Sequence, residues 1–293
     1  MALELQNVSY VYSPKTPFEK TAVDEVNLKI EDGSITGLIG HTGSGKSTVA
    51  QILTGLLRPT SGTVLLDGED IWQNTKNAMS KTRFRIGLVF QYPEYQLFEE
   101  TVYKDIAYGP ANMGLTSDEI RQRVWDAAAF VGLSPEILGK SPFELSGGQK
   151  RRVAIAGIMA MQPKILILDE PAAGLDPRGR DEILENLRQY RDKMGTAVVI
   201  ISHSMEDMAK LCDRIIVMSG GGVFRTGTPD EIFADAAALT KVGLDVPQIT
   251  KLAMKLGAMG VPFSRPVYTV RDAYEELSRF AASRGKESEG NRS

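Results

Sequence analysis

Residues 35–48 read ITGLIGHTGSGKST, and this stretch decides the fold. Its opening, ITGLIG, is typical of a short buried strand, because buried parallel strands are nearly continuous apolar runs. Residues 40–47 then fit the spacing G-x-x-x-x-G-K-[ST] in full. The following residues, VAQILTGLL, continue as a helix that ends before Arg58-Pro59. The order of strand, glycine-rich turn and helix predicts a phosphate-binding turn in an α/β protein.

The chemistry of this turn follows from its residue types. Glycines let successive backbone N–H groups point at phosphate oxygens, and the helix N-terminus adds partial positive charge. We expect Lys46 to reach the β- and γ-phosphates of a nucleotide and Ser47 to ligate Mg²⁺. A chance glycine-rich turn is the alternative, and the flanking strand and helix argue against it. The side chain of His41 is expected to point away. The predicted ATP-binding residues of this segment are Gly40, His41, Thr42, Gly43, Ser44, Gly45, Lys46, Ser47 and Thr48.

Composition indicates an ordinary globular protein. The chain has 293 residues, of which 42% are hydrophobic and 24% charged, with a formal net charge of -3. That balance provides no global basic field for nucleic acid or anionic lipid. The single cysteine, Cys212, cannot form an internal disulfide and is expected to be buried. We expect no signal peptide in MALELQNVSYVY, and no run approaches the roughly 18 apolar residues of a membrane span, so a membrane role requires another chain.

Alternation along the chain predicts the domain organisation. Strand-like runs cover residues 2–12, 22–30, 63–71, 84–90, 164–170, 196–203 and 214–227. Strands that alternate with helices predict a parallel sheet covered on both faces, with a mainly helical insertion over about 94–162. We predict one domain over 1–228. We predict a separate unit over 229–293, with helices over 249–260 and 270–285 and a disordered polar tail, GKESEGNRS.

Residues 164–170, KILILDE, form a second chemical motif. A buried parallel strand that ends in two acids delivers them to the edge of the sheet where α/β proteins bind ligands. Asp169 is therefore expected to hold Mg²⁺, usually through water, and Glu170 to polarise an attacking water. The alternative is a strand that ends in a solvated acidic turn.

A third motif, Leu145-Ser146-Gly147-Gly148-Gln149, precedes the basic, helix-prone run KRRVAIAGIMAM. Physically it is a second anion-binding turn at a helix N-terminus. LSGGQ at this place resembles the signature of the ABC ATPases, over about residues 2–228. Four further elements fall in the family's order: Tyr12, Gln91, Gly174-Leu175-Asp176 and His203.

The resemblance implies a P-loop NTPase fold and an ABC ATPase core with an inserted helical subdomain and a small C-terminal helical extension. In the family two subunits dimerise head to tail around ATP. The resemblance thus implies that Tyr12 stacks on adenine, although Tyr10 competes for that role. Catalysis is assigned to Glu170, His203 and Lys46, and Mg²⁺ to Ser47, Gln91 and Asp169. For His203 a purely structural role is the alternative. The residues implied to serve the partner's nucleotide are Leu145, Ser146, Gly147, Gly148, Gln149 and Asp176.

Two further segments resemble a subgroup, the ATPase subunits of energy-coupling factor (ECF) transporters, which import vitamins or transition-metal ions. They are residues 92–110, YPEYQLFEETVYKDIAYGP, and the extension 242–262. This resemblance implies a peripheral position at the cytoplasmic face of the cell membrane. It implies three partners: a second ABC ATPase, a transmembrane coupling protein and a substrate-capture protein. The chain looks more like the second of the two ATPases, and the second ATPase is either identical or merely similar.

We hypothesise that four acids near Gln91 form a groove for arginines of the coupling protein: Glu94, Glu99, Glu100 and Asp105. A solvated surface cluster is the alternative. Other classes stay open: another ABC importer ATPase, a soluble ABC ATPase acting on DNA or ribosomes, or a nucleotide-binding scaffold without turnover. The short insertion without heptads, the single cassette, and the presence of Glu170 and His203 argue against the last two.

Overall fold

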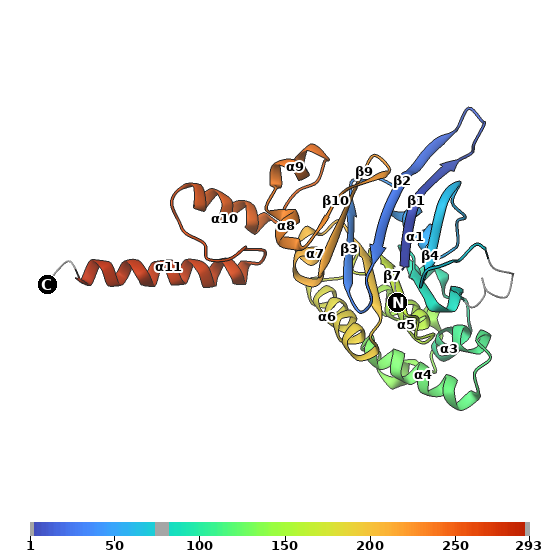
Figure 1. Ribbon diagram of the computed structural model, residues 1–293. Coiled ribbons are helices and arrows are strands. Elements are labelled where there is room, and N and C mark those ends of the chain that lie inside the picture. Colours follow the sequence, from blue (N-terminus) through green and yellow to red (C-terminus); the bar gives the residue numbers. More distant parts are fainter. Residues whose placement is uncertain (1–2, 74–81, 291–293) are drawn as a thin grey trace.

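The computed structural model describes residues 3–73 and 82–290. A central body carries two β-sheets with helices packed around them, and a helical arm extends from it at the C-terminal end (Figure 1). The predicted α/β fold is confirmed. Within the described residues, no helix combines the length and the apolar composition that a bilayer-spanning segment requires.

The larger sheet has six strands in the order β10-β9-β3-β8-β7-β6. The strands from β9 to β6 pair in parallel, and β10 pairs antiparallel with β9 at the edge. Their bounds are β3 Ile35–Gly40, β6 Ile86–Val89, β7 Ile165–Asp169, β8 Ala197–Ile201, β9 Arg214–Ser219 and β10 Gly222–Gly227. Parallel register brings the carboxyl ends of β3, β7 and β8 to one edge, because Leu38 and Asp169 both lie opposite Ile201. The glycine-rich turn, the acid pair Asp169-Glu170 and His203 follow these three strands and therefore lie at the same edge of the sheet.

The smaller sheet is antiparallel, in the order β2-β1-β4-β5. Its strands are β1 Leu3–Tyr12, β2 Lys20–Ile30, β4 Ser61–Leu66 and β5 Glu69–Asp70. The predicted strands over 2–12 and 22–30 are confirmed within the described residues, and the predicted run over 63–71 forms β4 and β5 with a turn at Asp67-Gly68. The register places Lys20 directly opposite Tyr12 at the hairpin end of the β1–β2 pair, next to the loop that joins the two strands.

Two hydrophobic clusters lie on the two faces of the six-stranded sheet. On β7, Leu166 and Leu168 belong to one cluster and Ile165 and Ile167 to the other, because successive side chains of a strand point to opposite faces. This two-sided burial explains why residues 165–168 form a continuous apolar run rather than an alternating one. One cluster includes α1 (Lys46–Leu53) and the smaller sheet, so α1 is packed between the two sheets.

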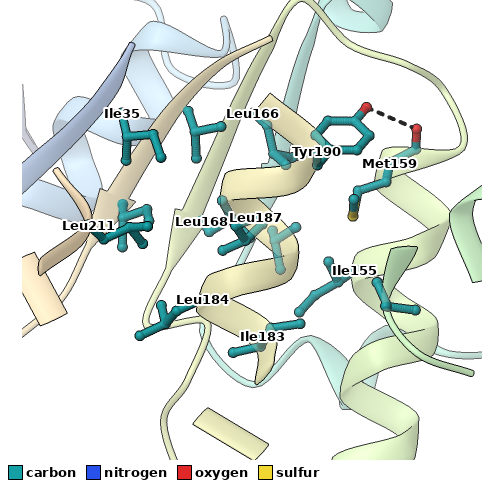
Figure 2. Packing of buried hydrophobic residues seen from close by; sticks show 14 of the residues in the cluster. Ile35, Ile155, Met159, Leu166, Leu168, Ile183, Leu184, Leu187, Tyr190 and Leu211 are labelled. Carbon is teal, nitrogen blue, oxygen red and sulfur yellow. Dashed lines mark hydrogen bonds between the residues drawn. The ribbon is translucent and has the colours of Figure 1, made fainter. Parts of the chain in front are cut away.

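The other face is covered by α6 (Pro177–Met194) and by the helical insertion. Figure 2 shows α6 with the strand residues Leu166 and Leu168 on one side and Ile155 and Met159 on the other. Tyr190 is buried there and donates its hydroxyl to the carbonyl of Met159 at 3.3 Å. The remaining helices of the body are α3 Val102–Asn112, α4 Ser117–Phe130, α5 Gly147–Met159 and α7 Met205–Leu211.

The predicted helical block over about 94–162 is present, but it is not uniformly α-helical. Short 3₁₀ turns occur at Pro93–Gln96, Pro135–Ile137 and Pro142–Glu144, each with proline at its start. Proline fixes φ and lacks an N–H group, which suits the first turn of a helix and not its interior. The predicted strand over 84–90 is shorter in the structure and begins at Ile86.

The C-terminal part consists of α8 Pro229–Phe233, α9 Ala236–Lys241, α10 Gln248–Ala258 and α11 Val270–Gly290. Its beginning is packed on the body, since Ile232, Phe233, Leu239, Leu244 and Val246 belong to the sheet's hydrophobic cluster. Of the tail predicted to be disordered, residues 285–290 belong to α11, and residues 291–293 lie outside the described residues. Extending an existing helix fixes only one residue for each added hydrogen bond, so polar residues suffice.

Candidate nucleotide-binding site

The glycine-rich turn joins β3 to α1 at the shared strand edge. Its conformation requires glycine at Gly45, where φ is 101° and a Cβ atom would lie 2.5 Å from the carbonyl oxygen of Ala22. The ammonium group of Lys46 folds back and donates to the carbonyls of Gly40 at 2.7 Å and His41 at 3.0 Å. Burial lowers the pKa of Lys46, and the nearby carboxylates of Asp169 and Glu170 oppose that shift. The turn therefore places a largely buried cation near two acids.

The first acid of the pair, Asp169, meets the start of α1. Ser47 donates its hydroxyl to Asp169 Oδ2 at 3.1 Å. Burial raises the pKa of Asp169, while the hydrogen bond from Ser47 and the charge of Lys46 lower it. A hydroxyl and a carboxylate oxygen suit Mg²⁺, which binds through one or two protein oxygens, keeps several waters and is completed by substrate phosphates. In the described part of the chain no group of three His, Cys, Asp or Glu side chains is arranged to hold a metal alone, which agrees with such a shared site.

The second acid, Glu170, has a strained backbone with φ of 52°, outside the range that side-chain-bearing residues favour. Its Oε2 accepts from Ser202 Oγ at 3.3 Å, and its Oε1 lies 3.5 Å from His203 Nε2. Oε1 is buried and has no hydrogen-bond partner among the described residues. Burial raises the pKa of Glu170, and the neighbouring His203 charge opposes that rise. The carboxylate is thus anchored at Oε2 by Ser202, and the backbone N–H of His203 also lies close enough to lower its pKa.

These groups line a cavity of about 260 Å³ together with Tyr12, Thr48 and Gln91. The hydroxyl of Tyr12 lies 3.3 Å from Thr48 Oγ1, and its ring packs edge-on against Tyr10 at 4.8 Å. The structure places Tyr12, and not Tyr10, along the cavity wall. Three lining residues have no motif and were missed by sequence reasoning: Lys20, Ala22 and Ile201.

The side chain of His41 lies outside this lining. Its Nδ1 is 2.8 Å from the carbonyl oxygen of Thr42, and its Cβ approaches Gly243 in the C-terminal part. Any contact of His41 with a ligand in this cavity therefore falls to its main chain. Ser44 is fully buried beneath the turn.

The LSGGQ segment lies away from the cavity of its own chain. Ser146 caps α5: its Oγ accepts from the N–H of Gln149 at 3.3 Å, and Gln149 Oε1 accepts from the N–H of Ser146 at 3.0 Å. A Cβ atom at Gly148 would lie 3.5 Å from Leu175 Cδ2, so the signature and the Gly174–Asp176 loop are neighbours. Asp176 caps α6 by accepting from the N–H of Gly179 at 2.6 Å. Neither segment lines the cavity that holds Lys46.

The four acids near Gln91 have different hydrogen-bond partners. Glu94 accepts two hydrogen bonds from Arg151, both at 3.1 Å, and the Arg151 side chain is only 4% exposed. Glu100 pairs with Lys104 at 2.5 Å on the surface. Asp105 accepts from the N–H groups of Phe98 at 3.2 Å and Glu99 at 3.3 Å.

A second cavity, of about 300 Å³, lies beside these acids and is mainly apolar. Of the four carboxylates only Asp105 lines it, next to Phe98 and Tyr108. Burial raises the pKa of Asp105 above its ordinary value. A groove at this place is thus an aromatic and aliphatic pocket with one acid, rather than the acidic cluster that the sequence predicted.

Comparisons with known proteins agree with this geometry. The family described as ABC transporter matches residues 23–173. The chain is 52% identical to the energy-coupling factor transporter ATP-binding protein EcfA2 of Caldanaerobacter subterraneus, over 96% of this chain and 98% of that protein. It is also 52% identical to EcfA2 of Clostridium perfringens, over 94% and 97% of the two chains.

Two solved structures are similar over the same body. One is cbiO1 from Clostridium perfringens, described as part of an ABC transporter complex, with TM-score 0.73 and 40% identity over 86% of this chain and 98% of that one. The other is a dimeric ATP-binding cassette in a post-hydrolysis state with ADP and phosphate, with TM-score 0.70 and 29% identity over 78% of this chain and 98% of that one.

Proposed function

The chain belongs to the ABC transporter ATP-binding proteins and, within them, to the energy-coupling factor group, and we propose how its residues hydrolyse ATP for an importer. It is an ATPase subunit of an ECF-type transporter. The observation that carries the residue assignment is the position of Glu170, which lines the same cavity as Lys46 and Asp169 and has its carboxylate held by Ser202.

ATP lies in the 260 Å³ cavity with its adenine against Tyr12 and its phosphates on the glycine-rich turn. Lys46 exchanges its two carbonyl acceptors for phosphate oxygens. Ser47, Asp169 and Gln91 would hold Mg²⁺, which would supply positive charge that offsets the negative charge of the phosphates. Each of these groups stabilises charge that is already present in the nucleotide.

Hydrolysis needs a water aimed at the γ-phosphate. Ser202 anchors one oxygen of Glu170, so the other accepts a hydrogen bond from the attacking water and orients it. The raised pKa of Glu170 makes it a better proton acceptor than an ordinary glutamate. His203, with its side chain 57% exposed beside Glu170, is placed to donate to the γ-phosphate as negative charge develops.

A second cassette completes the site. The LSGGQ turn and Asp176 lie outside the chain's own cavity, which supports their acting on a nucleotide held by the companion ATPase. A similar solved cassette is dimeric with ADP and phosphate bound, which supports a dimer of cassettes here. Closure around ATP then excludes bulk water, and the helical insertion moves with it.

The remaining partners follow from the group. A transmembrane coupling protein binds the apolar pocket of Phe98, Tyr108 and Asp105 on the cytoplasmic face of the membrane, and a separate substrate-capture protein selects the cargo. We propose residues 1–228 as the ATPase domain and residues 229–293 as a C-terminal domain for contacts between the ATPases, with the start of the latter, up to Val246, packed into the core of the former.

The test is co-purification of the tagged chain from membranes, followed by mass spectrometry. We expect a second cassette protein, a coupling protein with cytoplasmic arginines and a small hydrophobic capture protein. Recovery of ribosomes or DNA in place of a membrane chain would overturn the assignment to an importer.

The groove has its own test. Glu99 and Glu100 lie outside the lining of this pocket but follow its residue Phe98 directly in the chain. Reversing the charge of both to lysine is expected to remove the membrane chain from the purified complex while ATP binding persists. Glu136→Lys, at an exposed acid in another part of the insertion, is the control. An intact complex in the Glu99→Lys, Glu100→Lys protein would show that these acids do not receive the coupling protein.

A further inference from the structure

A hydrogen-bonded chain joins α6 to the segment that carries His203. Arg180, near the start of α6, donates through Nε to both oxygens of Asp207, at 3.0 and 2.9 Å. Its Nη2 also donates to Ser204 Oγ. Asp207 is 5% exposed, and a buried carboxylate is stable only when it is paired. Arg180 is thus the cation that compensates the charge of the buried Asp207 carboxylate in α7.

The chain continues from Ser204 to the proposed catalytic carboxylate. Ser204 caps α7 by accepting from the N–H of Asp207 at 3.2 Å. The N–H of Ser204 donates to Ser202 Oγ at 3.1 Å, and Ser202 Oγ donates to Glu170 Oε2 at 3.3 Å. A hydroxyl has one proton, so the N–H of Ser204 directs the only proton of Ser202 toward Glu170.

At its other end the hydrogen-bonded network is connected to the Gly174–Asp176 loop, which contacts the LSGGQ segment. The N–H of Arg180 donates to the carbonyl of Asp176 at 2.9 Å, within the first turn of α6. Asp176 ends the Gly174–Asp176 loop, whose Leu175 lies against the signature glycine Gly148. A shift of this loop is therefore transmitted to Arg180 through one helical turn.

The hydrogen-bonded network from Arg180 to Glu170 also lies between two cavities. Glu170 and His203 line both the nucleotide cavity and a neighbouring cavity of about 540 Å³. Arg180, Ser202, Ser204 and Asp207 line the larger cavity. Because one side of Glu170 opens onto this space, packing alone does not immobilise its carboxylate, and the hydrogen bond from Ser202 takes that role.

Building on the proposed function, we propose that Arg180 and Ser202 are positioning residues that hold the Glu170 carboxylate in its water-orienting direction. Arg180 acts through Asp207 and Ser204, and Ser202 acts directly. The network makes the orientation of Glu170 depend on the Gly174–Asp176 loop, which lies next to the signature. Neither Arg180 nor Ser202 is itself among the residues that line the nucleotide cavity.

The test measures kcat and KM for ATP in the complex of this chain with its companion ATPase. Arg180→Ala and Ser202→Ala are expected to lower kcat at least about tenfold, because small misplacements of a catalytic group have such effects. KM is expected to stay within about threefold, because the phosphate contacts are intact. Ser202→Thr keeps the hydroxyl and is expected to recover most of the activity, while Arg180→Lys recovers it only in part because it loses the two-pronged contact.

Arg188→Ala is the matched control. Arg188 also connects α6 to α7, donating to the carbonyl of Lys210 at 2.7 Å, but at the end of α7 far from Glu170. Its removal is expected to leave kcat unchanged. If Arg188→Ala and Arg180→Ala lower kcat equally, the role is structural and the proposal is wrong.

The remaining outcomes are also decisive. A kcat within about twofold of the wild type in both Arg180→Ala and Ser202→Ala overturns the proposal, as does a loss in Arg180→Ala alone. Should Arg180→Ala not fold, Ser202→Ala and Ser202→Thr decide the question, since they change one hydroxyl or add one methyl. The proposed function fails separately, if Glu170→Gln hydrolyses ATP at the native rate.

Discussion

The ammonium group of Lys46 lies at the phosphate end of the cavity, where burial disfavours its charged form. Two main-chain carbonyls and two nearby acids keep the ammonium group in place. The account predicts that Lys46→Ala weakens ATP binding about 10- to 100-fold, since a hydrogen bond to a charged group contributes about 1.5–3 kcal/mol. Titration with a fluorescent ATP analogue measures this.

Lys29→Ala serves as the control, because Lys29 forms only a surface pair with Glu4 at 3.5 Å. It should bind the analogue as the wild type does. Equal affinities of the Lys46→Ala and Lys29→Ala proteins would remove Lys46 from the phosphate site.

Glu276 is a second residue whose surroundings lead to a prediction, in the C-terminal part. Its side chain is 3% exposed and accepts from the N–H of Ser264 at 2.7 Å, from Ser264 Oγ and from Arg279. The hydrogen bond from the Ser264 N–H, followed by that from its hydroxyl, lowers the pKa of Glu276. A carboxyl whose pKa is lower in the folded state stabilises the fold above its unfolded pKa and loses this effect as the pH falls through the folded pKa.

Glu276→Gln is therefore expected to reduce the protection of α11 amides from hydrogen exchange at neutral pH. The difference from the wild type should shrink below about pH 4, where the unfolded glutamate is protonated. An equal difference in α11 protection between Glu276→Gln and the wild type at pH 7 and in acid would show that the charge of Glu276 does not stabilise its contact with Ser264.

At this scale the sequence identified the residues that a motif marks and missed those that the fold brings in. Lys46, Asp169 and Glu170 follow spacings that their chemistry requires, so they can be predicted from one sequence. Lys20 lines the cavity only because the β1–β2 register sets it opposite Tyr12. Arg180 has no motif, and its contact with Asp207 depends on how α6 packs beside α7.

Among the elements, α6 packs between the sheet and the helical insertion. The burial of its apolar face against both stabilises this position. Leu187 is 1% exposed within the cluster that includes Leu168 and Ile155 (Figure 2). Leu187→Ala is expected to lower the free energy of unfolding by about 2–5 kcal/mol, because a buried methyl-bearing side chain leaves a cavity. Urea denaturation measures it.

Gln189→Ala, at an exposed position of the same helix, is the matched control and should change the free energy of unfolding by less than about 0.5 kcal/mol. A cost below about 1 kcal/mol for Leu187→Ala would mean that α6 does not pack as described.

The elements themselves were largely predictable, because their periodicity is strong. The continuous apolar run 165–168 predicts β7, and the glycine-rich turn predicts the β3–α1 junction; both are confirmed. The 3₁₀ turns of the insertion were not predicted, since short proline-led turns have no hydrophobic period. The strand order was also beyond reach, because β3 pairs with β8 and β9, which follow it by more than a hundred residues.

For the molecule as a whole, the chemistry lies in the body and the C-terminal part is only partly separate from it. The sequence places a boundary at Pro229, whereas the hydrophobic core continues through Val246. The helices α10 and α11 then extend away from the sheets (Figure 1). Composition alone does not reveal such a boundary, because the sequence pattern changes after Pro229 although side chains up to Val246 still pack in the core of the body.

The central claim is that Glu170 of this chain orients the water that splits an ATP enclosed by two cassettes. Its most direct test is single-turnover hydrolysis in the complex with the companion ATPase, whose corresponding glutamate is changed to glutamine in both samples. With that site silent, the account predicts that Glu170→Gln binds ATP normally and splits it at least about 100-fold more slowly than the native chain. Hydrolysis at an unchanged rate in the Glu170→Gln complex would contradict it.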